Sequence, residues 1–328
     1  MTLATSLIRF CIAATAILIA VFAMLVVRRW IIERRAPIYA VRRSAITRNY
    51  LQRVAGYIEE PAAARWSVRE RLGAVGHLLL LLRGGERDRL IQLAEIDGLF
   101  DAVLAQTTGL NAARRIDAIR MLQQLGGEAA IAKLREILRI DPHRIVRLNA
   151  AFSLASFRRL PPPRETMRLL DMPGRAPTPL DIAILRALAP DYSDHLERML
   201  GDRMPHSRRA AIIDALGWSR NDAVMPTLER ASTFVDVEVR CAALRAAARL
   251  GQSAAAPWII AGLTDASSVV RIQAVNGCCV LGLQQALPAL RALTRDPEIW
   301  VRLRAEEAVL KLTPPPAGLA PMPLRMSA

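Results

Sequence analysis

The side chains that could perform chemistry are few and scattered in this sequence of 328 residues. No histidine occurs in a Cys-x-x-Cys, His-Glu or His-x-x-x-His arrangement, the spacings that let nearby side chains share a metal ion. Cys278 and Cys279 are adjacent, which is a poor geometry for a metal site or a bridge. The histidines are His77, His143, His195 and His206.

Phosphate-binding glycine loops of the Walker or dinucleotide type are also missing, and the pairs Gly84-Gly85 and Gly126-Gly127 are better explained as helix ends. We therefore expect no catalytic, cofactor-binding or metal-binding residues, no cofactor, no small-molecule substrate and no enzymatic activity.

Another set of residues recurs every 31 positions along the second half of the chain. Proline suits the first position of a helix, where a missing N–H costs nothing. A period of this length is typical of a solenoid, in which each unit is a pair of helices. The recurring residues are Pro226, Pro257 and Pro288, and the Val-Arg pairs that end in Arg240, Arg271 and Arg302.

An aspartate precedes the arginine by six residues in several units, as in Asp265 and Arg271. An aspartate in the turn between two helices can cap the second helix. The arginine, in the first turn of that helix, can reach this aspartate or the turn of the neighbouring unit. The turn Thr233–Val239 has no aspartate at the ladder position, so the ladder is incomplete. The expected structural ladder consists of Asp141, Arg147, Asp202, Arg208, Arg240, Asp265, Arg271, Asp296 and Arg302.

The second helices carry patterns such as Val239-Arg240…Leu250-Gly251 and Val270-Arg271…Leu281-Gly282. These patterns resemble the short bacterial form of the HEAT-repeat family, and the resemblance covers the repeat only. It implies an all-α fold, an α-solenoid of the armadillo type, in which the Asp/Arg pair is structural. We expect about eight helix pairs over residues 44–312. HEAT-like hydroxylases that bind iron use repeated His-Glu pairs, which this sequence lacks, and phycobilin lyases also contain the short form.

Two regions depart from the repeat. Residues 161–190 contain three consecutive prolines and a proline-rich loop, Met172–Pro179, and are either a degenerate unit or a binding loop. The last helix ends in LRAEEAVLKL, whose Arg304, Glu306, Glu307 and Lys311 can face water, as expected of a cap. Residues 313–328 are proline-rich, and we expect them to be disordered.

The N-terminal region contains an uncharged apolar stretch at residues 10–27. As a helix it would extend about 27 Å, close to the thickness of a bilayer core. A cleaved signal peptide is the alternative, but the run is long and no small-x-small cleavage site follows. We expect a transmembrane helix at 10–27, a short non-cytoplasmic segment at 1–9 and a basic juxtamembrane segment at 28–43. The expected membrane-interface residues are Arg28, Arg29, Trp30, Arg34 and Arg35.

Much of the net charge of +15 lies directly after this stretch, where the segment Arg28–Arg53 contains eight arginines and a single acidic residue, Glu33. The positive-inside rule then predicts a single-pass protein of the bacterial inner membrane, with its N-terminus outside and its solenoid in the cytoplasm. Two roles are open for the basic segment, namely contact with anionic lipid headgroups and setting the topology of the chain. The two roles are compatible.

These features favour a non-catalytic, membrane-anchored scaffold that binds a protein partner on its solenoid surface at the cytoplasmic face of the inner membrane. The alternative is an accessory subunit of a membrane enzyme, transport or signalling complex. A nucleic-acid-binding solenoid is less favoured, and no nucleic acid partner is expected, because the rest of the chain is only mildly basic.

Overall fold

The computed structural model describes residues 2–57 and 65–313, and within the first helix it leaves out the side chains of residues 2–14, 16 and 31–40. Every regular element in these ranges is a helix or a short 3-10 turn. The expected all-α solenoid is thus confirmed as a fold class. The chain divides into two compact units, residues 1–130 and 131–328, which are described separately.

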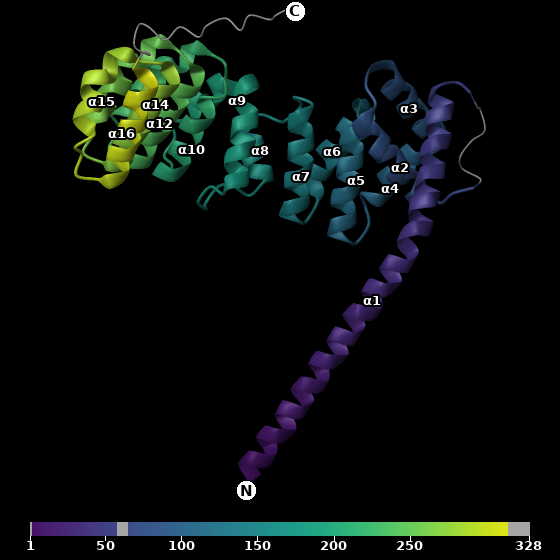
Figure 1. Cartoon of the computed structure of the whole chain (residues 1–328). Coiled ribbons are helices and arrows are strands. Elements are labelled where there is room, and N and C mark those ends of the chain that lie inside the picture. The colour runs from purple at the N-terminus through teal and green to yellow at the C-terminus, as the bar shows by residue number, and fades with distance from the viewer. Residues whose placement is uncertain (1, 58–64, 314–328) are drawn as a thin grey trace, which may run out of the picture. The chain divides into compact units, whose positions relative to one another are not determined.

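The N-terminal unit contains α1 (Thr2–Val54), α2 (Val68–Leu81), α3 (Gly84–Ile96), α4 (Leu99–Gln106) and α5 (Ala112–Leu125), and α6 (Gly127–Ile140) begins at its end (Figure 1). The last turns of α1 pack against α2 and α3. Asp97, whose side chain is fully buried, accepts hydrogen bonds there from Tyr50 (2.6 Å) and from Arg53 (2.8 and 3.0 Å). Burial raises the pKa of the Asp97 carboxyl, but these hydrogen bonds outweigh it and hold the pKa below its ordinary value.

Helix α3 is the element that the sequence pattern missed. Gly84 begins α3 rather than ending the preceding helix, which stops at Leu81. Gly84 has a φ of 55°, in the left-handed region that glycine enters without penalty, so the chain can turn directly from one helix into the next. At the other glycine pair, α5 does end at Leu125, with Gly126 as its C-cap.

The predicted transmembrane helix at 10–27, and with it the inner-membrane location, is wrong. Among the residues that the structure describes, no helix combines the length and the apolar content needed to cross a membrane.

The C-terminal unit contains the rest of α6, then α7 (Arg144–Ser156), α8 (Pro163–Leu169), α9 (Pro179–Met199), α10 (His206–Leu216), α11 (Met225–Ser232), α12 (Val237–Leu250), α13 (Ala256–Ala261), α14 (Ser268–Leu281), α15 (Leu287–Leu293) and α16 (Ile299–Leu312). From α11 onward each unit has a short first helix and a long second helix. The second helices α10, α12, α14 and α16 pack side by side, and α11 and α15 pack mainly on the second helix of their own unit. The second helices thus form one continuous layer (Figure 1).

Small side chains bring these second helices close together. A Cβ atom added to Gly217, at the end of α10, would lie 2.6 Å from the Cα of Ala246 in α12. The backbone of Gly217 is in the ordinary right-handed region, so this glycine is required for close approach and not for its φ angle. Alanine and Cys241 fill most of the buried positions of α12 around this contact.

The unit at 161–190 is irregular, as expected. Its second helix is the first part of α9, which is interrupted by non-helical backbone at Tyr192 (φ −137°, ψ 31°) and continues to Met199 as a second helical segment. Pro190 lies just before this interruption and lacks the N–H that would continue the helical ladder.

The final helix, α16, exposes the charged side chains Arg304, Glu306, Glu307 and Lys311. It also exposes Leu303 and Leu310, whose exposed fractions are 48% and 81%. These leucines lie 31 residues after Ile272 and Cys279 of α14, so the end of the array is only partly polar. The predicted disordered tail lies outside the described residues from position 314 onward.

Candidate binding surface

The expected arginine ladder joins the turns of successive units. Nε and Nη2 of Arg271 donate to both carboxylate oxygens of Asp296, at 2.8 and 2.7 Å. Nη1 of the same arginine donates to the carbonyls of Asp265 (2.9 Å) and Ala266 (3.2 Å) in its own turn. Arg240 makes the same two-oxygen contact with Asp265 and binds the carbonyls of its own turn. Each arginine therefore links two turns rather than closing one.

The aspartates have a different local role from the expected helix cap. Asp265 Oδ1 accepts from the N–H of Ser267 at 2.8 Å, and Asp296 Oδ1 accepts from the N–H of Glu298 at 2.9 Å. These contacts shape the turn before the helix begins, because Ser267 and Glu298 themselves occupy the N-cap positions. The hydrogen bonds from Arg271 hold the pKa of Asp296 below its ordinary value, and burial opposes them.

Arg208 is not placed like the other ladder arginines. Its Nη2 donates to the carbonyls of Met172 (2.6 Å) and Arg175 (2.7 Å), in the loop of the preceding unit. Arg209 instead binds its own turn through the carbonyls of Leu200 (2.7 Å) and Asp202 (3.4 Å). A signal for Arg209 was present, because it lies 31 residues before Arg240. The carboxylate of Asp202 pairs with Arg164 and not with Arg208.

The remaining ladder residues lie at the two ends of this region. Nη1 of Arg147 donates to the carbonyl of Asp141 at 2.7 Å, and Nη2 pairs with Asp171 in the next turn. Asp141 accepts from the N–H of His143 at 2.9 Å. Arg302 donates to the carbonyls of Asp296 (2.8 Å) and Pro297 (3.0 Å) in its own turn.

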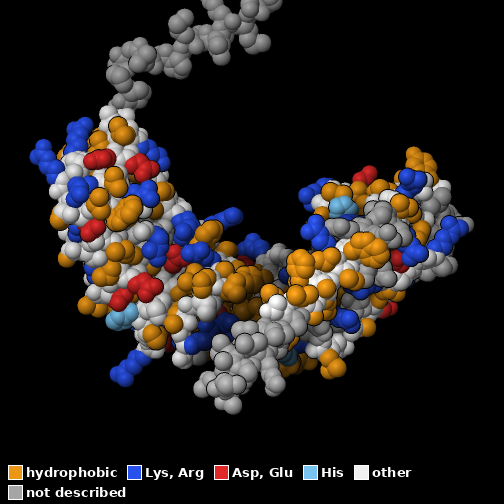
Figure 2. Space-filling model, turned by 60° about the horizontal axis from the view of Figure 1, so that its bottom comes forward, with side chains coloured by type: hydrophobic (Ala, Val, Ile, Leu, Met, Phe, Trp, Pro, Cys, Tyr) orange, Lys and Arg blue, Asp and Glu red, His pale blue; other side chains and the backbone are white. Residues whose placement is uncertain are grey.

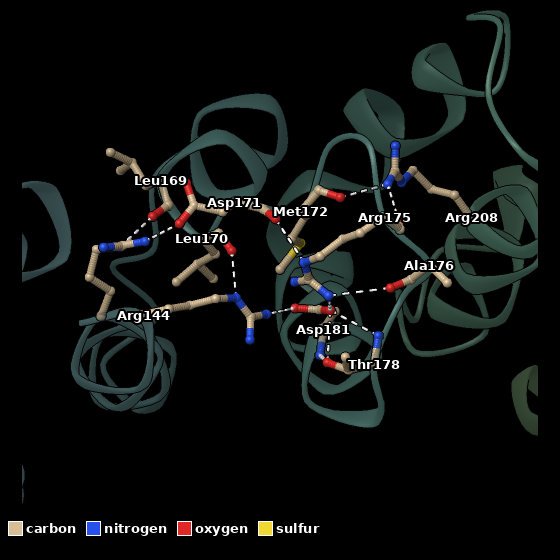
Figure 3. Close-up of polar contacts among 11 residues, drawn as sticks. Arg144, Leu169, Leu170, Asp171, Met172, Arg175, Ala176, Thr178, Asp181 and Arg208 are labelled. Atoms are coloured by element: carbon tan, nitrogen blue, oxygen red, sulfur yellow. Dashed lines mark hydrogen bonds and ion pairs between the residues drawn. The ribbon is translucent and has the colours of Figure 1, made fainter. Parts of the chain in front are cut away.

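The proline-rich loop of the irregular unit is held by arginines on both sides (Figure 3). Asp181, buried at the start of α9, pairs with Arg144 (2.5 Å) and Arg175 (2.7 Å) and forms a capping box with Thr178. Burial raises the pKa of Asp181, but the hydrogen bonds from Arg175 and Thr178 outweigh it and leave the pKa lowered. With Arg208 donating to the same loop, its polar groups are engaged in holding the unit together.

A cleft of about 770 Å³ lies between the C-terminal part of α9 and α11. Its polar groups are paired with one another, since the Thr227 hydroxyl donates to Glu197 and Arg230 donates to Thr227. These contacts link the C-terminal part of α9 to α11.

A different surface runs along the exposed edge of the second helices, and we call it the second-helix seam. Its positions repeat every 31 residues, and two residues come from each helix. The seam consists of Asp214 and Trp218 at α10, Arg245 and Arg249 in α12, Asn276 and Val280 in α14, and Glu307 and Lys311 in α16. Trp218 is 43% exposed and Val280 is 64% exposed.

Asp214 is the buried centre of an arginine cluster within the seam. Arg186 Nε, from α9, donates to Asp214 Oδ2 at 2.7 Å. Arg245 Nε lies 3.5 Å and Arg249 Nη1 3.8 Å from Asp214 Oδ1. The guanidinium carbons of Arg186 and Arg249 lie 5.6 and 4.5 Å from the ring centre of Trp218. Sequence reasoning missed this cluster, although Asp214 and Arg245 share the 31-residue spacing.

The described residues contain no group of three or more His, Cys, Asp or Glu side chains that could hold a metal ion. Cys241 and Cys278 are buried, and burial raises the pKa of the Cys278 thiol to about 12. A thiol of this kind is protonated at neutral pH and is a poor nucleophile.

The expected membrane-interface residues all lie on α1. Arg28, Arg29 and Trp30 are exposed, and the side chains of Arg34 and Arg35 lie outside the described part of the chain.

A family model for HEAT repeats matches residues 235–311. This part of the chain is therefore similar to HEAT repeats. It contains α12 to α16, where the arginine ladder is regular, and the expectation of a HEAT-type solenoid is confirmed for this part of the chain. No curated protein matches the sequence.

Several solved structures resemble the fold at low identity. Human deoxyhypusine hydroxylase is 17% identical, covering 84% of this chain and 98% of that one, with a TM-score of 0.33. A designed armadillo repeat protein is 21% identical over 65% of this chain and all of that one, with a TM-score of 0.31. The complex of CpcE and CpcF of phycocyanin lyase from Nostoc is 18% identical over 78% of this chain and 96% of that one, with a TM-score of 0.24.

Proposed function

We propose that this protein is a non-catalytic scaffold that binds a protein partner along the second-helix seam. The observation that carries the proposal is the exposure of Trp218 and Val280 on the same edge as arginines whose side chains are about one third exposed. Aromatic, aliphatic and arginine side chains together are the composition typical of protein interfaces. HEAT and armadillo-like repeats are in general scaffolds for protein interaction, which supports this role.

The arginine ladder has a structural role in this proposal. Its members donate to carboxylates and carbonyls of their own and neighbouring turns, so their hydrogen-bonding groups are directed into the array. We place the solenoid at residues 44–312, which is supported by the packing of Ile46 and Tyr50 at its start and by the end of α16 at Leu312.

The test is crosslinking in cells with the full-length chain, followed by mass spectrometry of the attached proteins. Val280→Asp places a charge on the seam, whereas Val235→Asp places the same charge at a turn position that is 80% exposed and lies outside the seam. We expect Val280→Asp to lose a partner that the original chain and Val235→Asp both retain. If the same proteins are captured by all three chains, the seam does not bind the partner.

A further inference from the structure

Three guanidinium groups share a single carboxylate in the seam, so positive charge exceeds negative charge there. Arg186, Arg245 and Arg249 contact Asp214, and none of them has another hydrogen-bond acceptor within the described residues. The cluster therefore carries a local charge of about +2 at neutral pH, since arginine stays protonated in proteins.

The hydrogen bonding within the cluster is also unequal. Only the bond from Arg186 to Asp214 has a good length, and the contacts of Arg245 and Arg249 at 3.5 and 3.8 Å are too long to be strong hydrogen bonds. Burial, together with the neighbouring Arg186 and Arg245, lowers the pKa of Arg249 despite the opposing effect of Asp214. A second oxyanion would relieve this repulsion.

Access to the cluster is from one side. Asp214 is buried beneath the arginines, with 4% of its side chain exposed, whereas the three arginine side chains remain about one third exposed. The Trp218 ring lies against two of the guanidiniums and restrains them, which reduces the entropy lost when they bind a ligand. The open side of the cluster is thus a preorganised site for an anionic group.

We propose that this cluster binds a carboxylate from an acidic segment of the protein partner, and this inference rests on the proposed scaffold function. Two observations favour an acidic segment over a nucleic acid backbone. The positive charge is local, because the next seam positions are the uncharged Asn276 and Val280, followed by Glu307 and Lys311, whose charges cancel. Basic and acidic side chains are also interspersed over the face shown in Figure 2, whereas a phosphate backbone is bound by an extended basic stripe.

The exposed Val280 lies one unit beyond Arg249, at the equivalent position of α14. An apolar contact therefore borders the anion site on the seam. The ligand expected is a peptide in which an Asp or Glu side chain is accompanied by an apolar one, and free phosphate alone does not use both features.

The experiment measures fluorescence anisotropy of labelled peptides and DNA titrated with the full-length protein. The probes are a peptide of alternating Glu and Leu, a matched peptide of Lys and Leu, and a DNA duplex, and inorganic phosphate is added as a competitor. We expect the acidic peptide alone to bind, and Arg249→Gln to weaken its binding about tenfold, the loss of roughly one charge-assisted contact. Arg291→Gln, an exposed arginine of α15 outside the seam, is the matched control and should bind as the original chain does.

Arg186→Gln provides the same test from a different helix if Arg249→Gln does not fold, as judged by circular dichroism. Equal binding by the variants and the original chain overturns the site, as does preferential binding of the DNA or displacement of the acidic peptide by inorganic phosphate. If the site is overturned while Val280→Asp still loses its crosslinked partner, the scaffold function stands without this cluster. If the peptide binds but no crosslinked partner depends on Val280, the scaffold function is the part that is wrong.

Discussion

The guanidinium carbon of Arg209 lies 5.3 Å from the ring centre of Phe234. Phe234 occupies the turn position that Asp265 and Asp296 occupy in the next two units. An aromatic ring attracts a cation through its negative face. The link between successive turns is thus kept at this point, although the aspartate of the ladder is missing.

Replacing Phe234 tests whether this contact substitutes for the ladder pair. We expect Phe234→Asn to lower the melting temperature, with a stability loss of about 1–2 kcal/mol, because it removes the ring without supplying a charge. Phe234→Asp should lose less, because its carboxylate can pair with Arg209 as Asp265 pairs with Arg240. Thermal unfolding followed by circular dichroism compares the two, and equal losses would contradict the substitution.

The regular part of the ladder should be important for stability. Arg271→Gln leaves Asp296, with 5% of its side chain exposed, without its charged partner, and we expect a loss of about 2 kcal/mol. The control is Arg304→Gln, which removes an exposed pair with Glu307 on α16 and should leave the melting temperature unchanged. Similar losses in the two variants would show that the bridge between turns contributes no more stability than an ordinary surface ion pair.

The sequence predicted the repeat where its period is strict, and it was wrong where the spacing within a single unit was used in place of the period. The spacing of Arg240, Arg271 and Arg302 located the bridges between turns because each turn has the same geometry. Arg208 fits the six-residue step from Asp202, but the 31-residue frame, which leads to Arg209, determines which side chain faces the next turn.

Other features depend on contacts that no local pattern contains. The cluster around Asp214 draws its arginines from α9 and α12, so it exists only after the second helices have packed. The helix α3 depends on the backbone freedom of Gly84, which a pattern of apolar residues does not record. The apolar stretch of α1 predicted a membrane span from hydropathy alone, and the described residues contain no such span.

Acid should destabilise both units of the chain. The pKa values of Asp97, Asp265 and Asp296 are lowered in the folded state. A lowered pKa contributes stability that is present above the unfolded value of about 4 and is lost as the pH falls through the folded value. We expect the melting temperature to be level near neutrality and to fall steeply below about pH 4.

A single variant separates the contribution of Asp97 from general acid unfolding. Asp97→Asn is less stable than the original chain at pH 7, because Arg53 loses its charged partner. Its melting temperature should then depend less on pH below 4, since one of the coupled carboxylates is gone. If the melting temperatures of the two chains fall equally with pH in this range, Asp97 does not contribute to the acid sensitivity.

The close approach of α10 and α12 at Gly217 gives a further stability test. Gly217→Ala would place a methyl group 2.6 Å from the Cα of Ala246. Because the atoms that clash belong to the backbone, the clash is relieved only if α10 and α12 move apart. We expect a loss of about 3 kcal/mol, together with weaker binding at the seam, because Trp218 follows directly in the chain.

Gly73→Ala is the matched control within α2, where the added methyl group meets nothing within 4 Å. It should stabilise the protein by about 0.5–1 kcal/mol through helix propensity. Opposite shifts of the melting temperature are therefore expected for the same substitution, and shifts of the same sign would show that the second helices do not need this close approach.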